Sequence, residues 1–166
     1  ADPDCILLRE RFHDLSDDQL RSLALFAGLA GGVLMTSDQL DEVPEPRRKL
    51  LADLADHGIP HRCEFPLLGK TALRYRLGTA PSGAPMALSQ GDPLLVQRVQ
   101  RTDGSVLVNV FNTGDTPTER FIDWKLAGAE GNVTEDDAPV ACDQHGWLVR
   151  LRPHQSRLFR IATSPI

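Results

Sequence analysis

Cysteine is scarce in this chain, and its placement excludes the usual roles of clustered cysteines. Cys5, Cys63 and Cys142 are the three cysteines among 166 residues, and they form neither a CxxC motif nor a close pair. We therefore expect no metal site and no disulfide framework, and no cofactor is indicated. This usage fits the cytoplasm slightly better, although a secreted protein with few disulfides would look the same.

Basic residues and long apolar runs are also lacking. Lys and Arg number 18 against 23 Asp and Glu, which gives a formal charge of -5. Nucleic acid is excluded as a partner on this ground, because phosphate binding needs a basic face. No apolar stretch reaches the roughly 18 residues of a membrane span, and the first apolar run has no basic segment before it, so we expect neither a membrane partner nor a signal peptide.

The amino-terminal part has the pattern of a strand, a helix and a second strand. Residues 5–8 (Cys-Ile-Leu-Leu) are consecutively apolar, as in a strand buried on both faces of a parallel sheet, and residues 33–36 form the next such run. One βα unit cannot cover both faces of its own sheet. The chain is therefore predicted to begin inside a larger fold.

Two helices are predicted before residue 60. Ser16 and Gln19 form the pattern of a capping box at the start of the first, and Gly28 with the pair Gly31 and Gly32 is expected to end it. The second should span about residues 44–56, with prolines confined to its first turn.

After residue 70 the apolar period changes to two, which is typical of strands. Asp103 and Gly104 predict a tight hairpin turn between strands at 94–101 and 106–111. In the second of these, Val106, Val108 and Val110 should share one face, opposite 107, 109 and 111. Further strands are expected at 72–77, 118–123, 140–142, 147–151 and 157–161. Short strands at this spacing predict an antiparallel sandwich.

Three sets of side chains are candidates for chemistry. Asp2, Asp4 and Asp38 flank the two amino-terminal strands, as a pair of glycosidase carboxylates would. Asp38 equally fits a structural role in a turn.

The other two candidate sets are histidines and tryptophans. His57 and His61 are four residues apart, but Gly58 and Pro60 between them break a helix, which favours solvated loop histidines over a metal site. Trp124 and Trp147 fit stacking on sugars or burial in the core, and burial is the more common role of a large ring in an alternating strand.

Five segments are distinctive when taken together in this order. They are residues 2–9 (Asp-Pro-Asp-Cys-Ile-Leu-Leu-Arg), 31–38 (Gly-Gly-Val-Leu-Met-Thr-Ser-Asp), 69–72 (Gly-Lys-Thr-Ala), 107–112 (Leu-Val-Asn-Val-Phe-Asn) and 151–158 (Leu-Arg-Pro-His-Gln-Ser-Arg-Leu). Together they resemble the melibiase-type α-galactosidases, glycoside hydrolase family 36 and its clan relative family 27. The first two segments are the specific ones, the later ones agree with the family in order, and the match covers nearly the whole chain.

The resemblance implies an α/β part followed by an all-β part. Residues 1–62 would be the last two βα units of a (β/α)8 barrel, and residues 63–166 a carboxyl-terminal antiparallel β-sandwich. The family's nucleophile and acid/base are aspartates upstream of Asp2, so no residue here inherits a catalytic role. The second Asp of Asp-Pro-Asp and the residue after it line the family's galactose pocket, which makes Asp4 and Cys5 the substrate-binding candidates.

The leading hypothesis is thus the carboxyl-terminal portion of a retaining α-galactosidase-like hydrolase. It would be inactive alone, and its partners would be an α-galactoside or related oligosaccharide and the upstream part of the barrel. The alternatives are a non-catalytic β-sandwich that binds carbohydrate or stabilises a neighbour, and a hydrolase of another α-linked sugar. Exposed barrel strands predict that the isolated chain either packs them on its own sandwich and helices or self-associates through residues 5–8 and 33–35.

Overall fold

The computed structural model describes residues 6–11, 14–31, 35–57, 62–67, 75–79, 85–89 and 94–162. Two helices lie near the amino terminus, α1 (Asp17–Leu29) and α2 (Glu45–Asp56), with the 3-10 turn η1 (Leu40–Glu42) between them. A single helical turn, α3 (Trp124–Ala127), comes later. Within the described ranges, none of these helices combines the length and apolar character needed to cross a membrane.

The strands form one large antiparallel sheet and two small ones. The large sheet has the order β1-β4-β5-β10-β7-β8, while β6 pairs with β9 and β2 with β3. The strands are β1 (Arg62–Glu64), β2 (Tyr75–Thr79), β3 (Pro85–Ser89), β4 (Leu94–Gln100), β5 (Val106–Asn112), β6 (Thr118–Asp123), β7 (Asn132–Glu135), β8 (Ala138–Pro139), β9 (Gly146–Leu151) and β10 (Ser156–Ala162).

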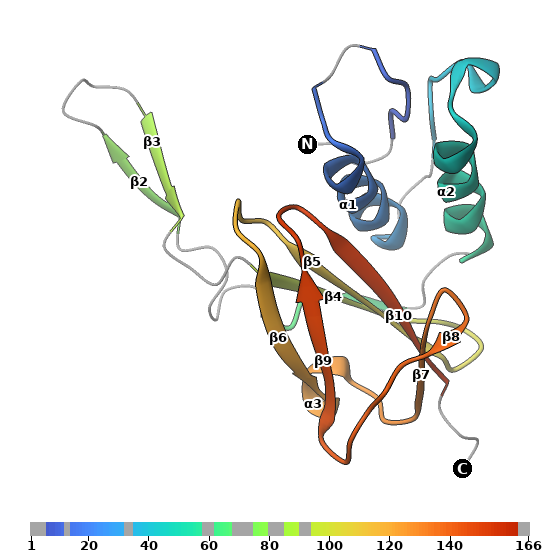
Figure 1. Ribbon diagram of the computed structural model, residues 1–166, viewed down its shortest axis with the longest axis vertical. Helices are drawn as coiled ribbons and strands as arrows, with labels where there is room; N and C mark the ends of the chain where they lie inside the picture. Colours follow the sequence, from blue (N-terminus) through green and yellow to red (C-terminus); the bar gives the residue numbers. More distant parts are fainter. Residues whose placement is uncertain are drawn as a thin grey trace.

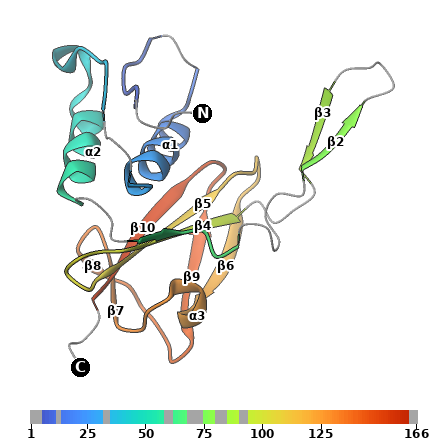
Figure 2. The ribbon, with the colours of Figure 1, turned by 180° about the vertical axis from the view of Figure 1, so that it is seen from behind.

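The elements are stacked in three layers. In Figure 1, α1 and α2 cover one face of the large sheet, and β6, β9 and α3 lie on its other side. The same layers are seen from behind in Figure 2, where the β2–β3 hairpin projects away from them. The predicted antiparallel sandwich is therefore confirmed, with a helix layer added to one of its faces.

Strand β5 supplies both cores because all of its residues are buried. Val106, Val108 and Val110 pack in the core between the two sheets, together with Trp147. Leu107, one position out of phase with the valines, packs in the core between the large sheet and the helices. The predicted division of this strand into two faces is confirmed, and both faces are buried because each meets its own layer.

The predicted local signals for helix start and hairpin turn are present. Ser16 Oγ accepts the Gln19 N–H at 3.3 Å, and the Ser16 N–H donates to Gln19 Oε1 at 2.9 Å, which completes the capping box of α1. Gly104 has φ of 83° in the turn between β4 and β5, a conformation that glycine adopts without steric cost.

Gly28 was expected to end the first helix, and this expectation is wrong. The residue lies inside α1, where a side-chain carbon would come within 2.9 Å of Leu54 Cδ2 on α2. Gly31, with φ of 86°, takes the left-handed position after the helix. Gly28 is therefore a packing residue that lets α1 and α2 approach each other.

The expected strand at 5–8 is not observed over its described part. Residues 6–9 carry no strand, and their link to the next segment is the hydrogen bond from the Ile6 N–H to the Met35 carbonyl at 2.8 Å. Ile6 and Leu8 are nonetheless buried among the leucines of α1 and α2. A continuous parallel strand requires partners along its edges, and the described residues supply one hydrogen bond of that kind. Residues 5, 33 and 34 lie outside the described residues.

The expectation of a strand at residues 140–142 is also wrong. Asp136 and Asp137 turn the chain earlier than predicted, so that β7 pairs with the two-residue strand β8. Val140 still donates its N–H to the Val133 carbonyl at 2.9 Å, but residues 141–142 form no strand. Sequence reasoning missed this turn because two consecutive aspartates are a weaker turn signal than Asn-Gly or Asp-Gly.

Candidate functional site

Asp38 joins the two amino-terminal segments from a buried position. Its side chain has no solvent-exposed surface, and its carboxylate lies 2.9 Å from Arg9 Nε. The same carboxylate accepts hydrogen bonds from the Leu8 N–H and, at 2.9 Å, from the Thr36 hydroxyl. Oδ2 accepts both hydrogen bonds and Oδ1 faces Arg9 in the ion pair, so these contacts make Asp38 a structural clamp and support the structural role that the sequence also allowed.

Arg47 holds the same segment from the other side. From α2, its Nη1 donates to the carbonyls of Leu8 at 3.0 Å and Arg9 at 3.3 Å, and its Nη2 pairs with Asp17 at 2.6 Å. The backbone at residues 8–9 is thus fixed by a carboxylate on its N–H side and a guanidinium on its carbonyl side. Sequence reasoning did not single out Arg47, since nothing in the local pattern distinguishes it from the neighbouring Arg48.

Asp4 and Cys5, the predicted substrate-binding residues, lie outside the described residues, as does Asp2. What the structure describes is the anchored backbone that begins directly after them. The substrate-binding assignment therefore stays a prediction. Within the described ranges, no group of histidine, cysteine and acidic side chains is arranged to hold a metal ion.

The two tryptophans belong to the sandwich core rather than to an open sugar-stacking face. Trp147 is 2% exposed and makes an edge contact with Phe159, with ring centroids 5.5 Å apart. Trp124 is half-buried, its ring centroid lies 5.6 Å from that of Trp147, and its indole N–H donates to the Gln144 carbonyl at 3.1 Å. Burial explains both rings, because each finds aromatic partners inside the molecule.

The cysteine thiols are poor nucleophiles where they are described. Burial raises the pKa of the Cys63 thiol, with the neighbouring Glu64 acting in the same direction. Partial burial also raises the pKa of Cys142, and the charge of Asp143 adds to that effect. The hydrogen bond from Gln97 opposes the shift of the Cys63 pKa, but its overall direction is upward, and a raised pKa reduces the share of the reactive thiolate at both sites.

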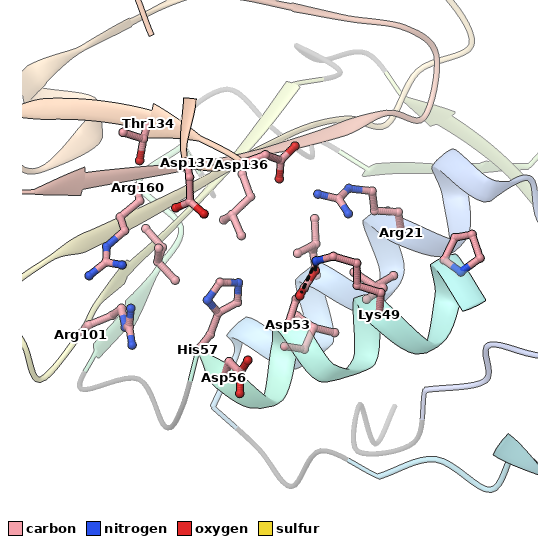
Figure 3. A pocket seen from close by; sticks show the side chains of 16 residues that line it. Arg21, Lys49, Asp53, Asp56, His57, Arg101, Thr134, Asp136, Asp137 and Arg160 are labelled. Carbon is pink, nitrogen blue, oxygen red and sulfur yellow. Dashed lines mark hydrogen bonds and ion pairs between the residues drawn. The ribbon is translucent and has the colours of Figure 1, made fainter. Parts of the chain in front are cut away.

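A cavity of about 600 Å³ lies between the helix layer and the large sheet. Figure 3 shows side chains from α1, α2, the β4–β5 turn, the β7–β8 turn and β10 around it. Lys49 and Asp53 form an ion pair of 2.7 Å on its α2 side, and this hydrogen-bonded carboxylate raises the pKa of Lys49. Arg101 and Arg160 lie on its sheet side, where both contact Asp103, at 3.6 and 3.2 Å.

His57 follows α2 at the edge of this cavity. It was expected to be a solvated loop residue, but it is half-buried, and burial lowers the pKa of its imidazole. The charge of Arg101 lowers that pKa further, while Asp53 acts in the opposite direction. The net shift favours the neutral imidazole. His61 lies outside the described residues.

With this geometry in hand, comparisons with known proteins become informative. No protein-family model matches the sequence, and no curated protein matches it either. Solved structures do match. The fold is shared with glycoside hydrolases.

Three of these structures show the extent of the match. A GH27 β-L-arabinopyranosidase from Geobacillus stearothermophilus has 15% identity and a TM-score of 0.68, over 93% of this chain and 32% of that chain. A putative α-galactosidase from Bacteroides fragilis has 13% identity and a TM-score of 0.72, over 99% of this chain and 33% of that chain. α-Galactosidase I from Mortierella vinacea has 10% identity and a TM-score of 0.63, over 95% of this chain and 38% of that chain.

The chain thus spans about a third of the length of these hydrolases. At such low identity the match establishes a common fold and does not transfer residue roles. It supports the β-sandwich and the glycoside-hydrolase-like fold expected from the resemblance, while the two barrel βα units stay a prediction, and the family named in these comparisons is 27 rather than 36.

Proposed function

We propose that this chain is the carboxyl-terminal part of a retaining α-galactosidase-like glycoside hydrolase. The observation that carries the proposal is the extent of the structural match. Nearly the whole chain, helix layer and sandwich together, has the same fold as a segment that makes up about one third of the length of such enzymes. A free-standing sandwich module would account for the sheets but not for the two helices packed on them with an anchored amino-terminal segment.

In this role the chain closes the barrel and supports one edge of the sugar pocket. Residues 1–62 would supply the last two βα units, and Asp4 with Cys5 would form the pocket wall. The contacts of Asp38 and Arg47 support this assignment, because they fix the backbone that follows those two residues. A pocket wall must be held rigidly if it is to position a sugar ring for reaction.

The chemistry would come from two carboxylates outside this chain. In a retaining glycosidase one carboxylate attacks the anomeric carbon while the other protonates the departing oxygen, and water then hydrolyses the glycosyl-enzyme. Asp38, which contacts the segment that follows the proposed pocket wall, is engaged by Arg9, Leu8 and Thr36 and would take no part in either step.

The test compares two lengths of the protein. The 166 residues alone should not hydrolyse an aryl α-galactoside, whereas a protein that also includes the coding sequence upstream of Ala1 should. Turnover by the isolated 166 residues would show that the chain holds its own catalytic pair. An extended protein without activity on any aryl glycoside would also contradict the proposal.

A hydrolase of another sugar is the second candidate. A β-L-arabinopyranosidase shares the fold over the same extent as the α-galactosidases do, so the fold does not select the sugar. Assaying the extended protein with aryl α-galactoside, aryl β-L-arabinopyranoside and aryl α-glucoside side by side separates the candidates. The substrate with the highest kcat/KM identifies the activity.

A further inference from the structure

We infer that the cavity between the helix layer and the large sheet is a binding site for a neutral saccharide. The cavity lies wholly within this chain, between α1 and α2 on one side and β5, β7 and β10 on the other. Its existence does not depend on any upstream barrel, and the inference does not rest on the proposed hydrolase role.

The size of the cavity suits a small ligand. Its volume of about 600 Å³ is in the range of roughly 300–1,000 Å³ in which small-molecule sites fall. Its inner wall is apolar, formed by leucines of the helix–sheet core that include Leu25, Leu54 and Leu107. Such a wall accepts the C–H face of a sugar ring and excludes water behind it.

The charge of the rim selects against an ionic ligand. Four cationic side chains and four carboxylates line the cavity, so the formal charges cancel. They are Arg21, Lys49, Arg101 and Arg160, against Asp53, Asp56, Asp136 and Asp137. Burial and Arg101 lower the pKa of His57, which favours its uncharged form. A phosphate or a polyamine would meet as much repulsion as attraction, whereas a neutral ligand meets none.

The hydrogen-bonding groups of the rim match hydroxyls. Carboxylates only accept and guanidinium groups only donate, while each sugar hydroxyl does both. In Figure 3, Arg101 and Arg160 lie on one side of the cavity and Asp136 and Asp137 lie near them on the β7–β8 turn, so the rim offers both donors and acceptors. The hydroxyls of a saccharide can use both kinds of partner.

The β7–β8 turn allows the rim to be altered with little disturbance of the backbone. Asp136 and Asp137 have φ of 46° and 64°, a region in which glycine is unstrained. Asp137→Gly therefore removes the carboxylate and keeps the turn. Glu130→Gln is a matched control, because it removes one exposed negative charge that does not line the cavity.

The test is a titration of the 166-residue chain with each ligand, in which the NMR signals of its backbone amides are monitored. Galactose, arabinose and maltose are added separately, with inorganic phosphate as the ionic comparison. At least one sugar should give saturable shifts centred on Arg101, Asp137 and Arg160. Asp137→Gly and Arg160→Gln should weaken its binding by about tenfold or more, the effect of losing a hydrogen bond to a charged group, and Glu130→Gln should bind as the parent does.

Three outcomes would overturn the inference. The first is the absence of saturable shifts with all three sugars, and the second is saturable binding of phosphate in the cavity at lower concentration than any sugar. The third is cavity shifts that persist unchanged in both rim variants. Circular dichroism of each variant establishes that it is folded, so that a loss of binding is attributable to the rim. A failure of the galactosidase assay would leave all of these outcomes unaffected.

Discussion

At the scale of single residues, the most consequential side chain is Asp38. Removing a buried carboxylate leaves its donors unpaired, and the donors here are a guanidinium, a hydroxyl and a backbone N–H. Unpaired buried groups cost more free energy than the original contacts contribute. Asp38 therefore stabilises the attachment of residues 8–9 to residues 36–38, next to the bond between Ile6 and Met35.

We expect Asp38→Ala to lower the free energy of unfolding by about 2–3 kcal/mol. Arg9 is partly exposed, which keeps the loss below that of a fully buried ion pair. Urea unfolding followed by circular dichroism measures the change. Asp41→Ala, which removes an exposed carboxylate in η1, is the control and should change stability by less than about 0.5 kcal/mol. Equal losses in the two variants would show that Asp38 is no clamp.

His57 should make stability depend on pH. Because burial lowers its pKa in the folded state, the unfolded chain takes up the proton first as the pH falls. Stability should be complete above about pH 6.5, the ordinary histidine pKa, and should decline as the pH falls from there through the folded-state value. Urea unfolding between pH 8 and pH 5 should show this decline in the parent and a flatter profile in His57→Gln.

The acidic groups do not obscure this effect. Hydrogen bonds from Arg98 lower the pKa of Glu64, and hydrogen bonds from Ser105 lower that of Asp103. Their stabilising contributions are present above the ordinary carboxyl pKa and are lost only as the pH falls below it. A parent and a His57→Gln variant with the same slope between pH 7 and pH 5 would contradict the assignment to His57.

At the scale of elements, the helix pair depends on the close approach at Gly28. An alanine there gains about 1 kcal/mol in helix propensity but meets Leu54, and overpacking a core costs about 1–3 kcal/mol. The two effects oppose each other in the single variant, so a double-mutant cycle is the informative measurement.

Gly28→Ala should be more favourable by about 1 kcal/mol in a Leu54→Ala background than in the parent, because the shortened side chain leaves room for the new methyl group. Denaturant unfolding of the parent, the two single variants and the double variant gives this coupling energy. Additive effects would mean that α1 and α2 are not in contact at this point.

Features that depend on residues within a few positions of one another could be predicted from the sequence. Features that depend on residues far apart in the chain could not. The capping box at Ser16 and the turn at Gly104 depend on residues within a few positions, and both were predicted. The clamp at Asp38 reaches a residue 30 positions away, and the carbonyl of Leu8 is 39 positions from Arg47. Gln97 is a further example, since its amide donates to the Phe26 carbonyl in the last turn of α1 at 3.0 Å across 71 positions. No spacing rule connects such pairs.

The candidate site was predictable only in part for the same reason. The resemblance identified the family of folds and pointed to Asp4 and Cys5. It gave no indication of the cavity, because its walls come from five separate elements that meet only after folding. Of the two roles considered for the tryptophans, sugar stacking and burial in the core, Trp147 has the buried one. The alternating pattern around this residue had already favoured burial.

At the scale of the whole molecule, four large apolar side chains in α1, in η1 or in the segments before them are exposed. They are Leu15, Leu23, Met35 and Leu40, at 38%, 50%, 48% and 49%. Ile6 and Leu8, by contrast, are buried among the leucines of the helices, at 2% and 0%. The apolar side chains available for association in this part of the chain are therefore these four rather than Ile6 and Leu8.

We expect the isolated chain to self-associate through these side chains. Leu23→Lys should shift sedimentation toward the monomer, because it places a charge at the most exposed of the four. Leu148→Lys is the matched control, since Leu148 is 45% exposed but lies on β9, in the layer across the large sheet from the helices. If Leu148→Lys produces the monomer and Leu23→Lys does not, the contact is on the sandwich instead.

Strand β5 has a consequence for how the molecule folds. Its valines belong to one core and Leu107 to the other, and every one of its residues is buried. Separating the helices from the sheet would expose the helix-side face of β5 to water. Because the sandwich retains this strand, the exposure would lower the stability of the sandwich. The two cores should therefore melt together in one cooperative transition. The smallest independently stable unit then includes both the helices and the sandwich, so the two parts distinguished in the sequence are not two units of folding.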